Sequence, residues 1–182
     1  MDKLKKINIF DSFLTNSEYK EVTEKVNNLT WTYGHTSTSD VNALPFWNSS
    51  LNDDPYFAEY LFNIIKKTVK EPLILERVYC NGLTYGQNGT YHTDSNDPNS
   101  RTFMIYVHDI PPEDYDIADG YLYFKFSELD YNILYEPIKN RGIYFPGNYV
   151  HKANGFSRFI KTMRRSVVWK THIKKDIENE II

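Results

Sequence analysis

Residues 73–94 read LILERVYCNGLTYGQNGTYHTD, and the hydrophobic pattern of the chain changes where they begin. From Leu73 onward, short runs of β-branched and aromatic residues alternate with turn segments that carry Gly or Pro. Such runs are typical of the strands of a sandwich or barrel. We therefore predict a mainly β fold with flanking helices, built as a double-sheet jelly roll. The expected strands are residues 73–80, 88–94, 101–108, 120–126, 132–138, 142–146, 148–153 and 164–171.

The residues before Leu73 are predicted to support this core with two helices. Thr15 and Glu18 have the spacing of a capping box, in which two side chains satisfy free backbone amides at the start of a helix. Asp54 is expected to cap the second helix, because a proline follows it. Residues 30–54 lie between these helices and are rich in Ser, Thr, Asn and Asp. We read them as a long loop that either binds substrate or is pinned to the core by its aromatic residues.

The length of 182 residues fits one domain. Within it, residues 1–72 are expected to supply the helices and the loop, and residues 73–171 the jelly-roll core. The 24 acidic residues outnumber the 21 basic ones, so no broad positive field predicts a nucleic-acid-binding protein. A single cysteine excludes an internal disulfide. No signal peptide is recognisable, and no apolar run approaches the roughly 18 residues of a membrane-spanning helix. We therefore expect a soluble cytoplasmic protein without a membrane partner.

His92, Thr93 and Asp94 end one predicted strand, and His151 lies on a later one. Side chains two residues apart in a strand point to the same face, so His92 and Asp94 can bind one ion. Two imidazoles and one carboxylate form the facial triad of non-haem Fe(II) oxygenases. The same donors with a water also suit a tetrahedral zinc site. From these three residues alone, hydrogen-bonded histidines without a metal remain a further alternative.

Other motifs surround this triad in a fixed order along the chain. They are TYGQNGTY at 84–91, RTFMIYVH at 101–108, DGYL at 119–122, EPIKNRGIYFP at 136–146 and RRS at 164–166. With these motifs, the chain from about Leu73 to Lys170 resembles the Fe(II)- and 2-oxoglutarate-dependent oxygenase superfamily, and within it the prolyl 4-hydroxylase-like branch. Asp119 departs from the pattern, because this family usually has a second glycine at that position.

The resemblance implies a fold, a set of cofactors and a reaction class. The fold is the double-stranded β-helix, a cupin-like jelly roll. Fe(II) would be bound by His92, Asp94 and His151, with 2-oxoglutarate and O2 as co-substrates and ascorbate as a supporting reductant. In the reaction, 2-oxoglutarate is decarboxylated to succinate and CO2 while a C–H bond of the second substrate is hydroxylated.

The resemblance also implies residues that bind 2-oxoglutarate. Arg164 matches the basic residue that pairs with the distal carboxylate, and its planar guanidinium suits two parallel hydrogen bonds. Ser166 shares its strand face, and Tyr106 would add another donor, with Tyr85 also assigned to the cofactor site. Lys161 remains the alternative cation, because Arg164 follows the distal histidine at a longer spacing than is usual.

The similarity to prolyl hydroxylases favours a peptide or protein substrate, such as a prolyl side chain. Trp31, Trp47 and Tyr91 are candidate substrate-binding residues that could grip an extended peptide or stack on a base. Nucleobase oxidation is therefore the alternative enzyme activity, and a non-catalytic metal-binding jelly roll is the alternative outside catalysis. The acidic loop 109–119 would favour a peptide or cationic substrate if it flanked the site. The oligomeric state is left open.

Overall fold

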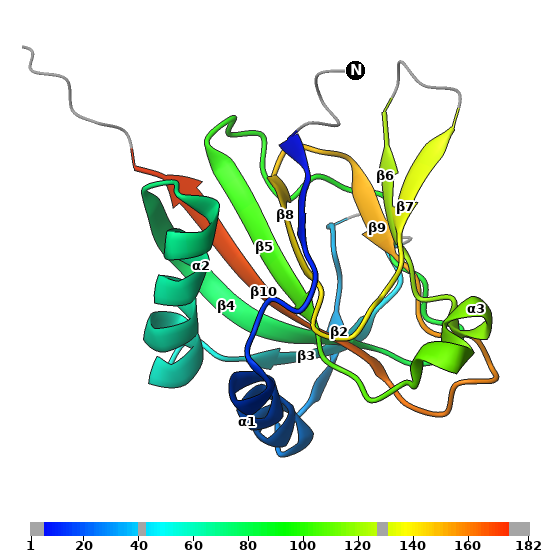
Figure 1. The fold of residues 1–182 in the computed structure, drawn as a ribbon. Helices are drawn as coiled ribbons and strands as arrows, with labels where there is room; N and C mark the ends of the chain where they lie inside the picture. The colour runs from blue at the N-terminus through cyan, green and yellow to red at the C-terminus, as the bar shows by residue number, and fades with distance from the viewer. Residues whose placement is uncertain (1–5, 40–42, 127–130, 175–182) are drawn as a thin grey trace, which may run out of the picture.

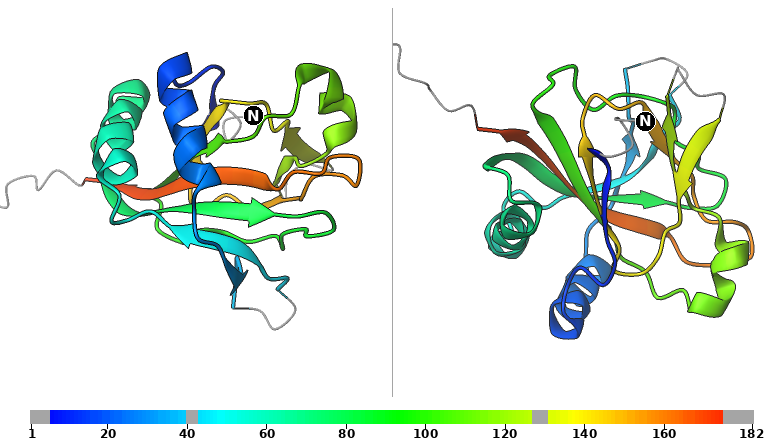
Figure 2. Two further views of the ribbon diagram at one scale, coloured as in Figure 1. Left: turned by 90° about the horizontal axis from the view of Figure 1, so that it is seen from below. Right: turned by 45° about the horizontal axis from the view of Figure 1, so that its top comes forward.

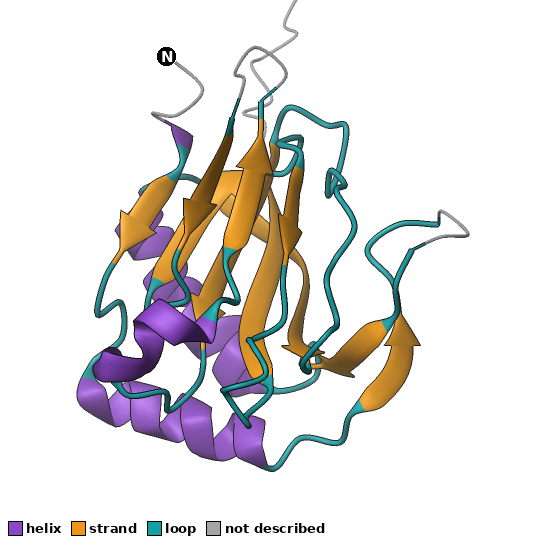
Figure 3. Ribbon diagram, turned by 90° about the vertical axis from the view of Figure 1, so that its right-hand side faces the viewer, coloured by secondary structure: helices purple, strands orange, loops and turns teal. Residues whose placement is uncertain are grey.

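The computed structural model describes residues 6–39, 43–126 and 131–174, and its strands form two antiparallel sheets (Figure 1). The larger sheet has seven strands, in the spatial order β1 (Asn8–Phe10), β8 (Gly142–Pro146), β5 (Ser100–Tyr106), β10 (Arg164–Ile173), β4 (Leu73–Leu83), β3 (Phe46–Ser50) and β2 (Thr32–His35). The smaller sheet has three, in the order β7 (Asn132–Tyr135), β6 (Leu122–Lys125) and β9 (His151–Ala153). Figure 3 distinguishes these strands from the flanking helices. The predicted mainly β architecture of two sheets is confirmed.

One predicted strand is wrong. Residues 88–94 form no strand and contact β9 only through isolated bridges, one of them between His92 and His151. The Gly89 amide bonds the Ala153 carbonyl at 2.7 Å, and a Cβ at Gly89 would lie 2.9 Å from that oxygen. The Asp94 amide then bonds the Gly147 carbonyl at 2.8 Å. The backbone of residues 88–94 therefore makes close but irregular contacts and does not form a continuous ladder of hydrogen bonds between strands.

The interpretation of residues 30–54 as a loop is also wrong. Strands β2 and β3 pair with each other, and β3 pairs with β4, so they extend the larger sheet. Polar side chains take part in this pairing, as when the Asn48 amide donates to Asn81 Oδ1 at 2.9 Å. The Ser- and Asn-rich composition conceals the strands, because their pairing depends on the exposed edge of β4. Residues 40–42 of this segment lie outside the described residues.

The two predicted helices are present, and both pack on the same face of the larger sheet (Figure 2). Helix α1 (Asn16–Asn27) begins with the predicted capping box, in which the Glu18 amide bonds Thr15 Oγ1 at 3.3 Å. The second begins with a π-helical segment (Tyr56–Leu61) and continues as α2 (Phe62–Val69). The Asp54 side chain accepts a hydrogen bond from the Tyr56 amide at 2.9 Å, so it pairs with a free backbone amide at the start of this helix, as expected. The short η3 (Pro112–Asp114) and α3 (Tyr115–Ala118) precede β6.

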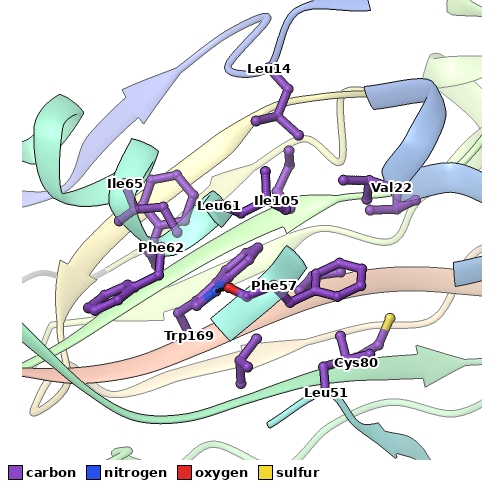
Figure 4. Packing of buried hydrophobic residues seen from close by; sticks show 14 of the residues in the cluster. Leu14, Val22, Leu51, Phe57, Leu61, Phe62, Ile65, Cys80, Ile105 and Trp169 are labelled. Carbon is purple, nitrogen blue, oxygen red and sulfur yellow. Dashed lines mark hydrogen bonds between the residues drawn. The ribbon is translucent and has the colours of Figure 1, made fainter. Parts of the chain in front are cut away.

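Two apolar clusters lie on opposite faces of the larger sheet. The outer cluster joins the helices to the sheet, and within it the indole of Trp169 donates to the Phe57 carbonyl at 2.9 Å (Figure 4). The inner cluster fills the space between the two sheets and includes Val168 and Phe145. Because β10 alternates its side chains, Trp169 packs outward while Val168 packs inward. The inner face of β10 therefore points toward the space where the predicted site residues lie.

His108 follows β5 and is fully buried. Its Nε2 contacts the Pro137 carbonyl, and its Nδ1 accepts from the Ile110 amide at 3.2 Å. These contacts use the neutral tautomer with the proton on Nε2. Burial lowers the pKa of His108 to about 4.

This burial predicts acid destabilisation. Between about pH 6.5 and 4 the unfolded chain protonates His108 and the folded chain does not, so stability falls with falling pH by roughly 1–3 kcal/mol. We expect the His108→Asn variant, although less stable at pH 7, to lose less stability over this range. Urea unfolding of both proteins with chelator at several pH values measures the slope. An equal slope would contradict the assignment.

Candidate active site

Two segments of the chain bring the predicted metal ligands together. His92 and Asp94 lie on the irregular segment after β4, and His151 is the first residue of β9. The backbones of His92 and His151 bond each other in both directions, at 3.0 and 2.9 Å. The donor atoms of the three side chains all lie within 4.8 Å of one another. This is the distance range in which three donors can bind one ion.

The two imidazoles are oriented by the backbone. Nδ1 of His92 lies 2.9 Å from the Thr90 carbonyl, and Nδ1 of His151 lies 2.8 Å from the Tyr149 carbonyl. Each Nδ1 is thereby assigned a proton, which leaves the Nε2 lone pair free for a metal. The Nε2 atoms of His92 and His151 lie 3.4 and 3.6 Å from Oδ1 of Asp94. Burial lowers the pKa of His151 to about 4, so this imidazole is a neutral ligand at pH 7.

The carboxylate of Asp94 is held through its other oxygen. Oδ2 accepts from Thr102 Oγ1 at 2.6 Å and forms an ion pair with Lys170. Burial by itself raises the pKa of Asp94, but Lys170 and the two histidines hold it well below its usual range. Oδ1 therefore remains available as a single anionic donor beside the imidazoles.

Lys170 is a site residue that the sequence analysis missed. Its side chain is 7% exposed, and its ammonium also donates to Thr102 Oγ1 at 3.2 Å. Burial would lower the pKa of Lys170, but Tyr79 and Asp94 together raise it, so it stays charged. The period of β10 contains the missing signal, because Arg164, Ser166 and Lys170 are separated by even numbers of residues and share one face.

Arg164 is buried on this face at the other end of the site. Its Nε donates to the Gly120 carbonyl at 2.8 Å, and its Nη1 lies 3.4 Å from Ser166 Oγ. Within the described part of the chain, Nη2 of Arg164 and the hydroxyl of Tyr106 have no hydrogen-bond partner. The guanidinium carbon lies 4.8 Å from the centre of the Tyr106 ring. These two unpaired donors, one of which belongs to the charged guanidinium itself, would fit an anionic group such as a carboxylate.

Gly120 fixes the position of Arg164. Its φ of +79° is a conformation that other residues rarely adopt, and a Cβ there would lie 2.5 Å from the Phe156 ring. This conformation turns the Gly120 carbonyl toward the guanidinium. The preceding Asp119, which departs from the family pattern in sequence, also has a positive φ, of 55°. The turn is therefore formed without a second glycine.

A pocket of about 180 Å³ joins the triad to Arg164. Besides these residues, its wall contains Ser166 and Lys170 from β10 and apolar side chains from both sheets: Met104, Leu122, Phe145 and Val168. One pocket thus contains a candidate metal site and a candidate anion site. This arrangement can bind a chelating acid to the metal and hold its far end.

The other predicted residues lie outside this pocket wall. Tyr106 is fully buried beside Arg164, whereas Lys161 and Tyr85 are exposed. The remaining three, Trp31, Trp47 and Tyr91, are partly exposed. Trp31 packs against the outer core, and the ring of Trp47 is tilted against that of Tyr33 with their centres 5.1 Å apart. The ring centre of Tyr91 lies 5.0 Å from the Lys152 ammonium. Loop 109–119 does not contribute to the wall either. The proposed roles of these residues in substrate or cofactor binding stay predictions.

Comparison with known proteins shows the fold. No protein-family model matches the chain, and no curated protein matches it significantly. A Trichoplax adhaerens prolyl hydroxylase, solved with a hypoxia-inducible-factor peptide fragment, is similar at 16% identity and a TM-score of 0.74, over 94% of this chain and 86% of that one. A Burkholderia pseudomallei oxidoreductase of the 2OG-Fe(II) oxygenase family is similar at 10% identity and a TM-score of 0.69, over 92% of this chain and 85% of that one. A Pseudomonas putida prolyl-4-hydroxylase is similar at 13% identity and a TM-score of 0.65, over 96% of this chain and 97% of that one.

The chain therefore has the double-stranded β-helix fold of the 2-oxoglutarate oxygenases. At these identities the comparison extends to the fold and not to the activity. None of the helices in the described ranges is long and apolar enough to span a membrane.

The ion pair between Lys170 and Asp94 can be tested by stability. Lys170→Met leaves a buried carboxylate without its counter-ion, so without metal we expect a loss of about 3–5 kcal/mol in unfolding free energy. In the Asp94→Asn background the same substitution should cost much less, because the amide carries no charge. Urea unfolding of the four proteins with chelator gives the coupling energy. A loss of equal size in both backgrounds would show that Lys170 acts by packing alone.

Proposed function

We propose that this chain is an Fe(II)- and 2-oxoglutarate-dependent dioxygenase that hydroxylates a C–H bond of a peptide or protein side chain, such as proline. The observation that carries the proposal is one pocket with two sites. A triad of two imidazoles and one carboxylate lies at one point of its wall, and a buried guanidinium with an unpaired nitrogen lies at another. 2-Oxoglutarate has matching ends, namely a chelating 2-oxo acid and a distal carboxylate.

Different residues would bind the metal and the co-substrate. Nε2 of His92, Nε2 of His151 and Oδ1 of Asp94 would hold Fe(II) from one side, which leaves positions open on the other. Arg164 and the Tyr106 hydroxyl would bind the distal carboxylate by charge-assisted hydrogen bonds. Burial raises the pKa of Tyr106 although the charge of Arg164 opposes the rise, so the phenol stays a donor.

When bound, Fe(II) and 2-oxoglutarate would supply O2 activation, which couples decarboxylation of the co-substrate to hydroxylation of the C–H bond. The protein orients these groups and limits the access of water. The apolar side chains of the pocket wall, among them Met104, Phe145 and Val168, serve this second purpose. Metal binding alone, as in a non-catalytic module or a zinc hydrolase, does not require the unpaired guanidinium of Arg164.

The choice of a peptide substrate is supported by one of the similar structures, which was solved with a peptide fragment. The fold by itself does not select a substrate. The whole sequence has a net charge of −3, which does not favour binding of a polynucleotide. Nucleobase oxidation therefore remains the less favoured alternative.

The metal site is tested by the loss of one ligand. His92→Ala should lower the affinity for Mn(II) by more than the roughly 10–100-fold that loss of a residue supporting a ligand costs. His172→Ala removes a histidine that lies outside the pocket and pairs with Glu76, so it serves as the matched control. Mn(II) titration followed by electron paramagnetic resonance gives both affinities. Unchanged binding in His92→Ala would refute the proposed centre.

The co-substrate site is tested by exchanging its cation. Arg164→Met should weaken 2-oxoglutarate binding by about 2–5 kcal/mol, or roughly 30-fold or more, because a buried charge pair is lost. Lys161→Met should leave the affinity unchanged, since this side chain is exposed outside the pocket. Anaerobic calorimetric titration of the Mn(II)-loaded proteins measures both. A loss in Lys161→Met instead would assign the carboxylate to the alternative cation.

Oxygenase activity is tested directly by succinate formation. The wild-type protein with Fe(II), ascorbate and O2 should convert 2-oxoglutarate to succinate, and Asp94→Ala should reduce the rate by at least about 100-fold, because a metal ligand is removed. Chromatography of the reaction mixture measures succinate. Turnover that persists in Asp94→Ala would contradict the assigned triad.

A further inference from the structure

The pocket wall carries more positive than negative charge. Among its described residues are three basic side chains, Arg77, Arg164 and Lys170, and Asp94 is the single carboxylate. Binding of Fe(II) together with 2-oxoglutarate does not change this excess, because the two charges of the ion and the two carboxylates of the co-substrate cancel. This excess of positive charge attracts a further anion into the pocket.

Two of the three cations have assigned partners. Lys170 forms an ion pair with Asp94, and Arg164 has the proposed contact with the distal carboxylate of 2-oxoglutarate. Arg77 has no such partner: none of the carboxylates in the described ranges lies within ion-pair distance of it. Its guanidinium lies over the ring of Tyr79, whose centre is 5.9 Å from the guanidinium carbon. The Arg77 side chain is exposed, so a molecule entering the pocket can reach it.

The position of Arg77 relates it to the metal site. Arg77 on β4 is the direct register partner of Lys170 on β10, and both side chains contribute to the pocket wall. Lys170 in turn contacts the metal ligand Asp94. Two like charges opposite each other on neighbouring strands repel, and an anion bound beside them would remove this repulsion. Arg77 therefore lies directly opposite Lys170, which forms the ion pair with the metal ligand Asp94.

The side chains around Arg77 add no negative charge. His35 of β2 also lines the pocket and lies 6.2 Å from the Tyr79 ring, centre to centre. Burial and the charge of Arg77 lower the pKa of His35, so it is a neutral neighbour at pH 7. The acidic loop 109–119 is absent from this wall, so it does not neutralise Arg77. The pocket wall around Arg77 therefore attracts an anion, and not the cationic substrate that this loop would have favoured.

We propose that Arg77 binds a carboxylate of the substrate, so that the enzyme selects acidic peptides with Asp or Glu close to the residue that is hydroxylated. This inference rests on the proposed oxygenase function and narrows its substrate class. Arginine suits a carboxylate because its planar fork makes two parallel hydrogen bonds. A phosphate backbone would meet the same fork, but a chain with a net charge of −3 repels a polyanion. A peptide side chain and a free small carboxylic acid share the recognised chemistry.

The experiment measures peptide binding without turnover. Fluorescein-labelled short peptides with one central proline carry Asp or Glu at each flanking position, and matched series carry Asn or Gln, or Lys. Their affinities for the protein loaded with Mn(II) and 2-oxoglutarate are measured anaerobically by fluorescence polarisation. Free glutamate, free aspartate and a single-stranded oligonucleotide serve as competitors. Succinate formation with Fe(II) and O2 is measured separately with the same peptides.

We expect an acidic peptide to bind roughly tenfold or more tightly than its amide counterpart. Arg77→Gln should abolish this preference, and Arg77→Glu should shift it toward the Lys series. Arg158→Gln, which changes an exposed arginine outside the pocket, should preserve it. A preference that survives in Arg77→Gln, or equal affinities in the wild type, would overturn the inference.

The competitors and the turnover assay separate the remaining outcomes. Competition by free glutamate as strong as by the peptide would assign the carboxylate to a small acid and overturn the peptide class, and so would tighter binding of the oligonucleotide. Acid-selective binding that depends on Arg77, without succinate formation, would uphold the Arg77 site and refute the oxygenase. Succinate formation without acid-selective binding would refute the Arg77 site alone.

Discussion

The buried carboxylate of Asp94 is the constraint on which the candidate site depends. Its Oδ2 is held by Thr102 and Lys170, and its Oδ1 lies beside the two imidazole Nε2 atoms. A carboxylate in this apolar space would otherwise take up a proton, and a neutral acid is a poor metal ligand. Lys170 removes that tendency within the folded protein. The three donors are therefore arranged for a cation by contacts that exist before any metal binds.

Strand β10 connects this constraint to the rest of the fold. Its inner face carries Arg164, Ser166 and Lys170, whereas its outer face carries Trp169, which packs under the helices. The indole contact with the Phe57 carbonyl fixes the strand relative to the π-helical segment. Stability and chemistry are thus separated by the two-residue period of one strand. A shift of register by one residue would exchange the faces and destroy both.

The distribution of charge in the pocket follows from the same strand pairings. Cations from β4 and β10 face a single carboxylate, and each is placed by the ladder that joins these strands. Arg164 lies at one end with an unpaired nitrogen, and the exposed Arg77 lies beside Lys170. The pocket is therefore suited to anionic partners at two separate points. The double-stranded β-helix supplies the frame, and these particular side chains supply the selectivity.

Much of the fold and part of the site follow from local sequence patterns. The β-branched runs after Leu73 and the capping box of Thr15 act over a few residues, so the sequence reveals them directly. The spacing of His92 and Asp94 also indicates a shared face without knowledge of the fold, although the segment itself is not a regular strand. Side-chain period and local hydrogen bonding are sufficient for these features.

By itself, then, the sequence determined the β-rich architecture, the helix starts and the identity of the candidate ligands, because these depend on near neighbours in the chain. Only the tertiary structure decided that Arg164 enters the pocket while Lys161 stays exposed. It also decided that Lys170 reaches Asp94 and that residues 46–50 form a strand paired with β4. These outcomes depend on which distant segment becomes a neighbour, and hence on the burial and pairing energies of the whole fold, which no local pattern records.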